Sequence, residues 1–338
     1  MATNDDWLAL TVEETLEPDL RICDPHHHLW EFRTERVEPR YLMDELQADL
    51  GSGHNIVSTV FIECRAMYRP EGPEALKFVG EVEFVNGIAA MSASGLYGPT
   101  KVAAGIIGSA DLLMGAGAGE TLDAQIAAGG GRFRGIRRSA TWDADEKIRN
   151  SRADPTPGLL LDKTFREGFA ELERRNLTFE GWIYHHQIPE LTDLARAFPG
   201  ITIILDHLGG PLGVGPYKGK RDDYFESWKS DIADLASCSN VVAKLGGINM
   251  DINGFFWHEN PKPPTSQELH EATRKYYEHM IEQFGVDRCM FESNFPVDKL
   301  SCSYNVLWNS FKRLASDYSA DEKAALFHDT ATRVYGLG

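Results

Sequence analysis

Short apolar runs of strand length recur along the chain, and longer polar or amphipathic stretches separate them. This alternation is typical of βα units, each of which adds one strand to a parallel sheet and returns over it with a helix. Eight such units favour a closed (β/α)8 TIM barrel, an α/β fold, over an open sheet. The predicted strands are Arg21–Asp24, Ile56–Glu63, Val102–Ile107, Phe133–Arg138, Thr178–Tyr184, Ile201–Asp206, Val241–Leu245 and Cys289–Phe291.

Apolar residues at helical spacing predict amphipathic helices around the strands. Two glycine-rich segments, Gly115–Gly119 and Gly213–Lys220, lack the spacing of nucleotide-binding motifs and are expected to be loops. Since no repeat or linker divides the 338 residues, we expect one domain over residues 1–338, in which residues 1–20 form an N-terminal extension. The predicted helices are Glu120–Ala128, Lys163–Arg175, Pro189–Phe198, Glu268–Phe284, Tyr304–Ala315 and Ala320–Tyr335.

Charge and composition restrict the partners. A net charge of −17 would repel a phosphate backbone, and no basic stripe offsets it, so nucleic acid is not expected as a partner. The acidic start Met1–Asp6 does not resemble a signal peptide, and no later stretch is apolar for long enough to span a bilayer. The five cysteines form no Cys-x-x-Cys pair, as expected for reduced thiols. We expect a cytoplasmic protein with a small-molecule substrate and no membrane partner, and a homo-oligomer is left open.

A histidine cluster follows the first predicted strand, in the run Asp24-Pro25-His26-His27-His28. Residues two apart on an extended chain face the same way, so His26 and His28 are expected to point together and His27 into packing. Two imidazoles on one side of a strand end can bind a metal or hold an anionic substrate oxygen. A solvated histidine run is the competing interpretation, which the preceding apolar strand disfavours.

The same run resembles the Asp-x-His-x-His signature of the amidohydrolase superfamily. The resemblance covers Asp24–Arg333 and points to the amidohydrolase-related branch that contains 2-pyrone-4,6-dicarboxylate lactonase and sugar lactonases. It implies a barrel with its chemistry at the C-terminal ends of the strands, where His26, His28 and His207 would meet. His207 directly follows an apolar run, which agrees with that location. The other similar segments are Phe133–Arg137, Trp182–Gln187, Leu205–Pro211 and Met290–Pro296.

The last strand departs from the family pattern. In many members it ends in an aspartate that binds metal or activates water, and Asn294 stands at that position here. An amide cannot take a proton from water at neutral pH and is a poor zinc ligand. Two possibilities remain open for the cofactor: one divalent metal such as zinc, with His26 and His28 as ligands, or no metal, with these histidines holding the substrate directly.

Charge and alternation suggest further site residues. Glu63 is a candidate general base or metal ligand, or a structural partner of Arg65. Asp206 is expected to face away from the site. Asp298 is expected on a surface loop, although a loop that folds back could bring its carboxylate to the site. Because the chain is so acidic, an anionic substrate needs positively charged side chains close to it. Arg137 is the residue expected to bind the carboxylate or carbonyl of the substrate. The other candidate substrate contacts are Arg65, Tyr184 and His186. An aromatic wall of the site could be formed by Trp30, Tyr68 and Trp182. A loop over the site could be formed by Phe255–Pro264.

These features together predict a hydrolase that opens a lactone, or a related ester of a small carboxylated ring, with activated water. Two alternatives stay open. One is a metal-dependent decarboxylase or hydratase of an aromatic or unsaturated acid. The other is a barrel that binds a ligand without catalysis, which the missing aspartate keeps open. The candidate catalytic residues are His26, His28, His207, Asn294 and Glu63.

Overall fold

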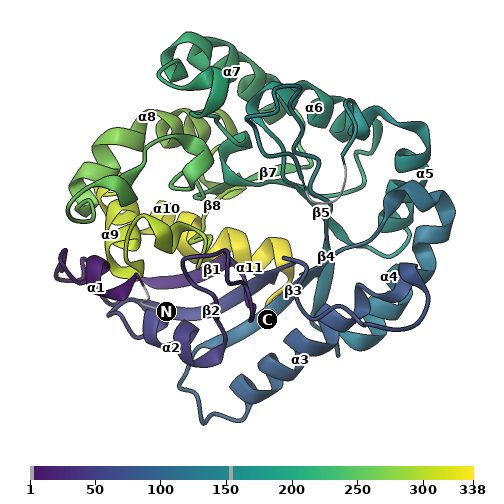
Figure 1. Ribbon diagram of the computed structural model, residues 1–338, viewed down its shortest axis with the longest axis horizontal. Coiled ribbons are helices and arrows are strands. Elements are labelled where there is room, and N and C mark those ends of the chain that lie inside the picture. The colour runs from purple at the N-terminus through teal and green to yellow at the C-terminus, as the bar shows by residue number, and fades with distance from the viewer. Residues whose placement is uncertain (1–3, 152–154) are drawn as a thin grey trace.

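The computed structural model describes residues 4–151 and 155–338. Its eight strands pair in parallel in chain order and are ringed by helices (Figure 1). Residues 1–3 of the expected N-terminal extension, and residues 152–154, lie outside the described part. The strands are β1 (Arg21–His27), β2 (Asn55–Ile62), β3 (Lys101–Gly108), β4 (Phe133–Arg137), β5 (Thr178–Gly181), β6 (Ile203–Leu205), β7 (Val241–Leu245) and β8 (Cys289–Phe291).

Main-chain hydrogen bonds close the sheet between β1 and the segment after β8. The amide of His28 donates to the carbonyl of Phe295 at 2.8 Å, and the amide of Asn294 donates to the carbonyl of His26 at 2.9 Å. His27 and Phe295 also form a parallel bridge. The predicted (β/α)8 barrel is therefore confirmed, and its closure brings the histidine cluster beside the position of Asn294.

The helices cover the outside of the barrel, and within the described residues none is long and apolar enough to cross a membrane. Four helices were not predicted: α1, α2, α3 and α7. In α3 the sequence is apolar on most sides, and in α7 the buried face is narrow. The helices are α1 (Asp5–Leu8), α2 (Met43–Leu50), α3 (Val79–Ala93), α4 (Ala118–Ala128), α5 (Lys163–Glu173), α6 (Ile188–Ala197), α7 (Arg221–Ala236), α8 (Ser266–Phe284), α9 (Tyr304–Leu314), α10 (Ala320–Ala324) and α11 (Thr330–Tyr335).

The predicted helix Ala320–Tyr335 is interrupted, because a π-helical turn at Ala325–Asp329 separates α10 from α11. The glycine-rich segments also differ in part from the expected loops. Gly115–Gly119 completes a 3-10 helix and begins α4, whereas Gly213–Lys220 is a loop with one 3-10 turn.

Helix α11 packs against one end of the barrel interior. Ala331 and Tyr335 belong to one buried apolar cluster with strand residues such as Ile107 and Ile204, and the Tyr335 hydroxyl donates to Glu180 inside the barrel at 2.5 Å. Parallel strands in such a barrel are buried on both faces, which explains their unbroken apolar runs. The opposite end of the barrel, where the strands finish, holds the pocket described next.

Candidate active site

A pocket of about 420 Å³ lies at the C-terminal ends of the strands. This is the face where barrel enzymes place their chemistry. The expected loop Phe255–Pro264 contributes no residue to its wall, as far as the described residues show, whereas Trp30, Tyr68 and Trp182 all line it. The sequence-predicted site residues on its wall are His28, Glu63, Arg65, Arg137, Tyr184, His207 and Asn294.

Three histidine rings lie close together at this end of the barrel: His28 and His207 line the pocket, whereas His26 is fully buried and is not part of its wall. The centroid of the His26 ring lies 4.9 Å from that of His28 and 4.5 Å from that of His207. His27 points the other way, where its Nε2 lies 2.9 Å from the hydroxyl of Thr59. The alternation expected for this run thus agrees with the structure.

The ring of His28 has a defined tautomer. Its Nδ1 lies 2.9 Å from the carbonyl oxygen of Ile62, and because a carbonyl only accepts, Nδ1 must carry the proton. The lone pair is therefore on Nε2. Burial, and then the positive charge of Arg137, hold the pKa of His28 well below its usual value, so the ring is neutral at neutral pH.

His207 is paired with a carboxylate, that of Glu292, which was not among the residues predicted from the sequence. Its Nδ1 lies 2.7 Å from Oε1 of Glu292, which is fully buried. Since a carboxylate only accepts, Nδ1 donates and Nε2 keeps a lone pair. Gly247 leaves the room for this ring, because a Cβ at that position would lie 2.0 Å from Nδ1 of His207.

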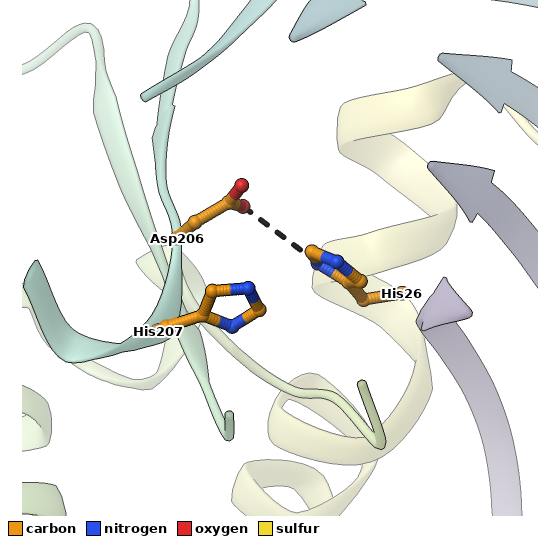
Figure 2. Close-up of side chains that lie close together, drawn as sticks. All are labelled: His26, Asp206 and His207. Carbon is orange, nitrogen blue, oxygen red and sulfur yellow. Dashed lines mark ion pairs between the residues drawn. The ribbon is translucent and has the colours of Figure 1, made fainter. Parts of the chain in front are cut away.

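The expectation that Asp206 faces away from the site is wrong. Its Oδ1 lies 3.8 Å from Nδ1 of His26, and both side chains point into the barrel together with His207 (Figure 2). The reason is the backbone after β6, where His207 and Leu208 have φ of 53° and 58°. The strand has ended there, so simple alternation no longer decides which way a side chain points.

Arg137 links the pocket wall to the histidines. Its Nε donates to Oε1 of Glu63 at 3.0 Å, its Nη2 donates to the Glu63 carbonyl at 2.5 Å, and its Nη1 lies 3.2 Å from Nε2 of His26. Glu63 is therefore paired with Arg137 and not with Arg65. Since Oε1 of Glu63 already accepts from Nε of Arg137, this oxygen is not free to take a proton from water.

The fifth strand is shorter than predicted, which changes the placement of Tyr184 and His186. β5 ends at Gly181, and a 3-10 turn at His185–Gln187 replaces the expected extension. Tyr184 lines the pocket and its hydroxyl donates to the carbonyl of Arg149. The side chain of His186 is one third exposed, and its Nε2 lies 3.0 Å from the carbonyl of Trp142, away from the pocket wall.

Asn294 is held as an amide by a buried acid. Its Nδ2 donates to Oδ1 of Asp298 at 2.9 Å, and Oδ2 of Asp298 accepts from the amide of Asn249 at 3.2 Å. The expectation of a surface position for Asp298 is wrong, since its side chain is fully buried. Burial raises the pKa of Asp298 to about 7, although the hydrogen bond from Asn294 opposes this.

Behind His26 lies a set of charged side chains, here called the ionic centre: Glu180, Asp206, Lys244 and Glu292. All four are fully buried. Burial alone would lower the pKa of Lys244, but the nearby carboxylates of Glu180 and Asp206 outweigh it and raise that pKa above its usual value. The lysine is therefore a charged ammonium. The sequence carried a signal, because Lys244 and Glu180 interrupt apolar strands, where charged residues seldom occur without a partner.

The structure also allows a test of the metal that the histidines suggest. Donor atoms of His26, Asp206 and His207 all lie within 4.8 Å of one another, as in a metal site. However, Nδ1 of His26 lies 3.2 Å from Nζ of Lys244, and Nε2 lies 3.2 Å from Nη1 of Arg137. Each nitrogen of His26 thus has a cation 3.2 Å away, and Nδ1 also has Oε2 of Glu292 at 2.7 Å. These residues do not fit a divalent ion while Lys244 and Arg137 keep these positions.

Comparisons with known proteins agree with the fold and the motifs. A family model described as Amidohydrolase matches residues 23–337. The uncharacterized protein y4mH of Sinorhizobium fredii is 33% identical and covers 94% of this chain and 99% of its own. An L-fucono-1,5-lactonase of Burkholderia multivorans is 26% identical and covers 62% of this chain and 64% of its own. A crystal structure of an amidohydrolase from Burkholderia multivorans with bound zinc has a TM-score of 0.72 at 22% identity, and covers 94% of this chain and 99% of its own. At this identity the similarity shows the fold alone.

Proposed function

The chain belongs to the amidohydrolase family, and we propose that within it this protein is a lactonase that opens a small carboxylated ring with activated water. One observation carries the proposal. His207 stands on the pocket wall with its Nδ1 bound at 2.7 Å to the buried carboxylate of Glu292. A histidine fixed in this way has the tautomer and the counter-charge of a general base.

In this proposal His207 takes the role that the family's aspartate would have at position 294. Its Nε2 removes a proton from water as the water oxygen attacks the ring carbonyl. The imidazolium that forms is stabilised by Glu292. Asn294 cannot serve as the base, but its amide is held in the pocket wall by Asp298 and keeps this part of the site in place.

Arg137 supplies the positive charge for the oxygen. Its guanidinium lies on the pocket wall and is positioned by Glu63 and by Nε2 of His26. A preorganised cation at the carbonyl oxygen stabilises the charge that develops there. The tetrahedral intermediate collapses by breaking the ring C–O bond, and the leaving alkoxide takes the proton back from His207. The products are an alcohol and a carboxylic acid on one open chain, and the acid ionises to a carboxylate by releasing its proton to solvent.

The charge of the pocket supports an anionic substrate. Among the described residues, its wall has seven basic ones against two acidic ones, Glu63 and Glu74, although the whole chain carries a net charge of −17. Such local enrichment attracts and holds carboxylates. The similarity to an L-fucono-1,5-lactonase supports the lactone bond itself. The basic residues are Arg33, Arg36, Arg65, Lys77, Arg137, Arg138 and Arg149.

The test is a screen of sugar lactones and carboxylated pyrones, with acid release followed by a pH indicator. We expect turnover of at least one lactone and a loss of about 10³-fold or more in kcat for His207→Ala. The matched control is His279→Ala on α8, whose ring contacts the carbonyl of Lys229 on α7 and not the pocket. Carbon dioxide release from aromatic acids with no lactone turnover would establish the decarboxylase alternative. Ligand binding with no turnover of any kind would establish the non-catalytic one.

A further inference from the structure

The ionic centre contains a cation that the proposed reaction does not use. Lys244 projects from β7 into the closed barrel, where its Nζ lies 2.5 Å from Oε2 of Glu180, 3.2 Å from Nδ1 of His26 and 3.5 Å from Oδ1 of Asp206. The lysine and all three partners are fully buried. A lysine in such a place must be held by its partners, because an unpaired buried charge is very unfavourable.

The carboxylates of Asp206 and Glu292 lie near Lys244 and need a positive charge to balance theirs. Oδ1 of Asp206 and Oε2 of Glu292 are buried and make no hydrogen bond with the residues that the structure describes. Oδ1 of Asp206 is within ion-pair distance of Lys244, and Oε2 of Glu292 lies 2.7 Å from Nδ1 of His26, the same nitrogen that Lys244 approaches. These oxygens and this nitrogen are the donor types that bind divalent ions. Here they surround an ammonium group.

We propose that the ammonium of Lys244 is a resident cation that takes the place of a divalent metal beneath His26. It neutralises Asp206 and its neighbours, and it keeps divalent ions out. The exclusion is geometric as well as electrostatic. An ion bound at about 2 Å from Nδ1 of His26 would have to share the space with Nζ, which lies 3.2 Å from that nitrogen. This inference does not depend on which substrate the pocket takes.

Cobalt(II) is the probe, because its visible d–d absorption reports the coordination of the bound ion independently of activity. The wild-type protein, stripped with chelator, equilibrated with Co²⁺ and passed through a desalting column, is expected to retain less than about 0.1 equivalent. Lys244→Met, which removes the charge and keeps much of the volume, is expected to retain about one equivalent with d–d bands. His26→Asn in the Lys244→Met background should abolish that retention.

Two controls complete the experiment. Lys163→Met, at a side chain on α5 that is 93% exposed, should behave as wild type. Lys244→Arg keeps the charge and should not gain Co²⁺. If Lys244→Met does not fold, as judged by circular dichroism, the wild-type measurement still decides. Stoichiometric Co²⁺ retention by the wild type that is lost in His26→Asn would overturn the proposal, as would a folded Lys244→Met that binds no Co²⁺.

Discussion

Replacing Asn294 by aspartate places a carboxylate beside that of Asp298, and we expect it to destabilise this protein. In the wild type, Nδ2 of Asn294 donates to Oδ1 of Asp298 at 2.9 Å, and Asp298 is fully buried. The substitution removes that donor and places a second carboxylate against the first. Two carboxylates in contact cannot both ionise without a large penalty.

The magnitude follows from these contacts. Loss of a hydrogen bond to a charged group lowers the free energy of unfolding by about 1.5–3 kcal/mol. Repulsion between the two carboxylates lowers it further until the pair takes up a proton. We therefore expect a total loss of about 3 kcal/mol in the free energy of unfolding at pH 8. For 338 residues the unfolding entropy is about 0.7 kcal/mol/K, so the melting temperature should fall by about 4 °C.

The pH dependence has a definite sign. Burial raises the pKa of Asp298 to about 7 from 3.8. The folded state therefore binds more protons than the unfolded state between these values, and this group reduces stability as the pH rises from about 4 to 7. In Asn294→Asp the pair shares a proton at pH 5 and one acid donates to the other, so the destabilisation should shrink there.

The assay is thermal unfolding at pH 5 and pH 8 of wild type, Asn294→Asp and the double variant Asn294→Asp/Asp298→Asn. The double variant exchanges amide and acid and restores one donor opposite one acceptor, so it should recover most of the lost stability at pH 8. Equal melting temperatures of wild type and Asn294→Asp at pH 8 would refute the reasoning. So would a double variant no more stable than Asn294→Asp.

Two further outcomes are expected. Gly247→Ala should lower kcat by about 100-fold, because its Cβ would lie 2.0 Å from Nδ1 of His207 and displace the ring. Gly285→Ala is its control, since that glycine also has positive φ but nothing within 4 Å; equal loss of kcat in both variants would contradict the argument. Burial lowers the pKa of His27 in the folded protein from 6.5 to about 4. Between these pH values the unfolded state binds a proton at His27 and the folded state does not, so the free energy of unfolding falls as the pH drops below about 6.5. His27→Gln should therefore reduce the difference in urea-unfolding free energy between pH 7 and pH 5 by about 2 kcal/mol, and an unchanged difference would count against this role of His27.

The fold was largely predictable from the sequence, because buried parallel strands are continuous apolar runs and all eight predicted strands match observed ones. The errors lie at strand ends. The predicted strand Thr178–Tyr184 is too long, because Ile183 is apolar and buried in the irregular segment that follows the end of β5 at Gly181. Helix α7 was not predicted because its buried face is narrow and leaves only a weak apolar pattern in the sequence. The residues of α7 that are buried are Trp228, Ile232, Leu235 and Ala236.

The site was predictable only in part. His26 and His28 are two residues apart, so local geometry was enough to bring them together. The partners of Lys244 and His207 could not be found in this way, because Glu180 is 64 residues from Lys244 and Glu292 is 85 residues from His207. Such pairs form only when the barrel closes. Asp206 shows the same limit, since a positive φ after a strand is not visible in an apolar pattern.

Helix α11 completes the ionic centre from the far end of the barrel, through the hydroxyl of Tyr335 and Oε1 of Glu180. It follows all eight strands in the sequence, so a chain emerging from the ribosome has made every strand before this contact can form. Until then the interior around Glu180 and Lys244 lacks its cover. Assembly of the reactive interior is therefore a late event in synthesis, and partly made chains should remain open to chaperones and proteases that recognise exposed barrel interiors.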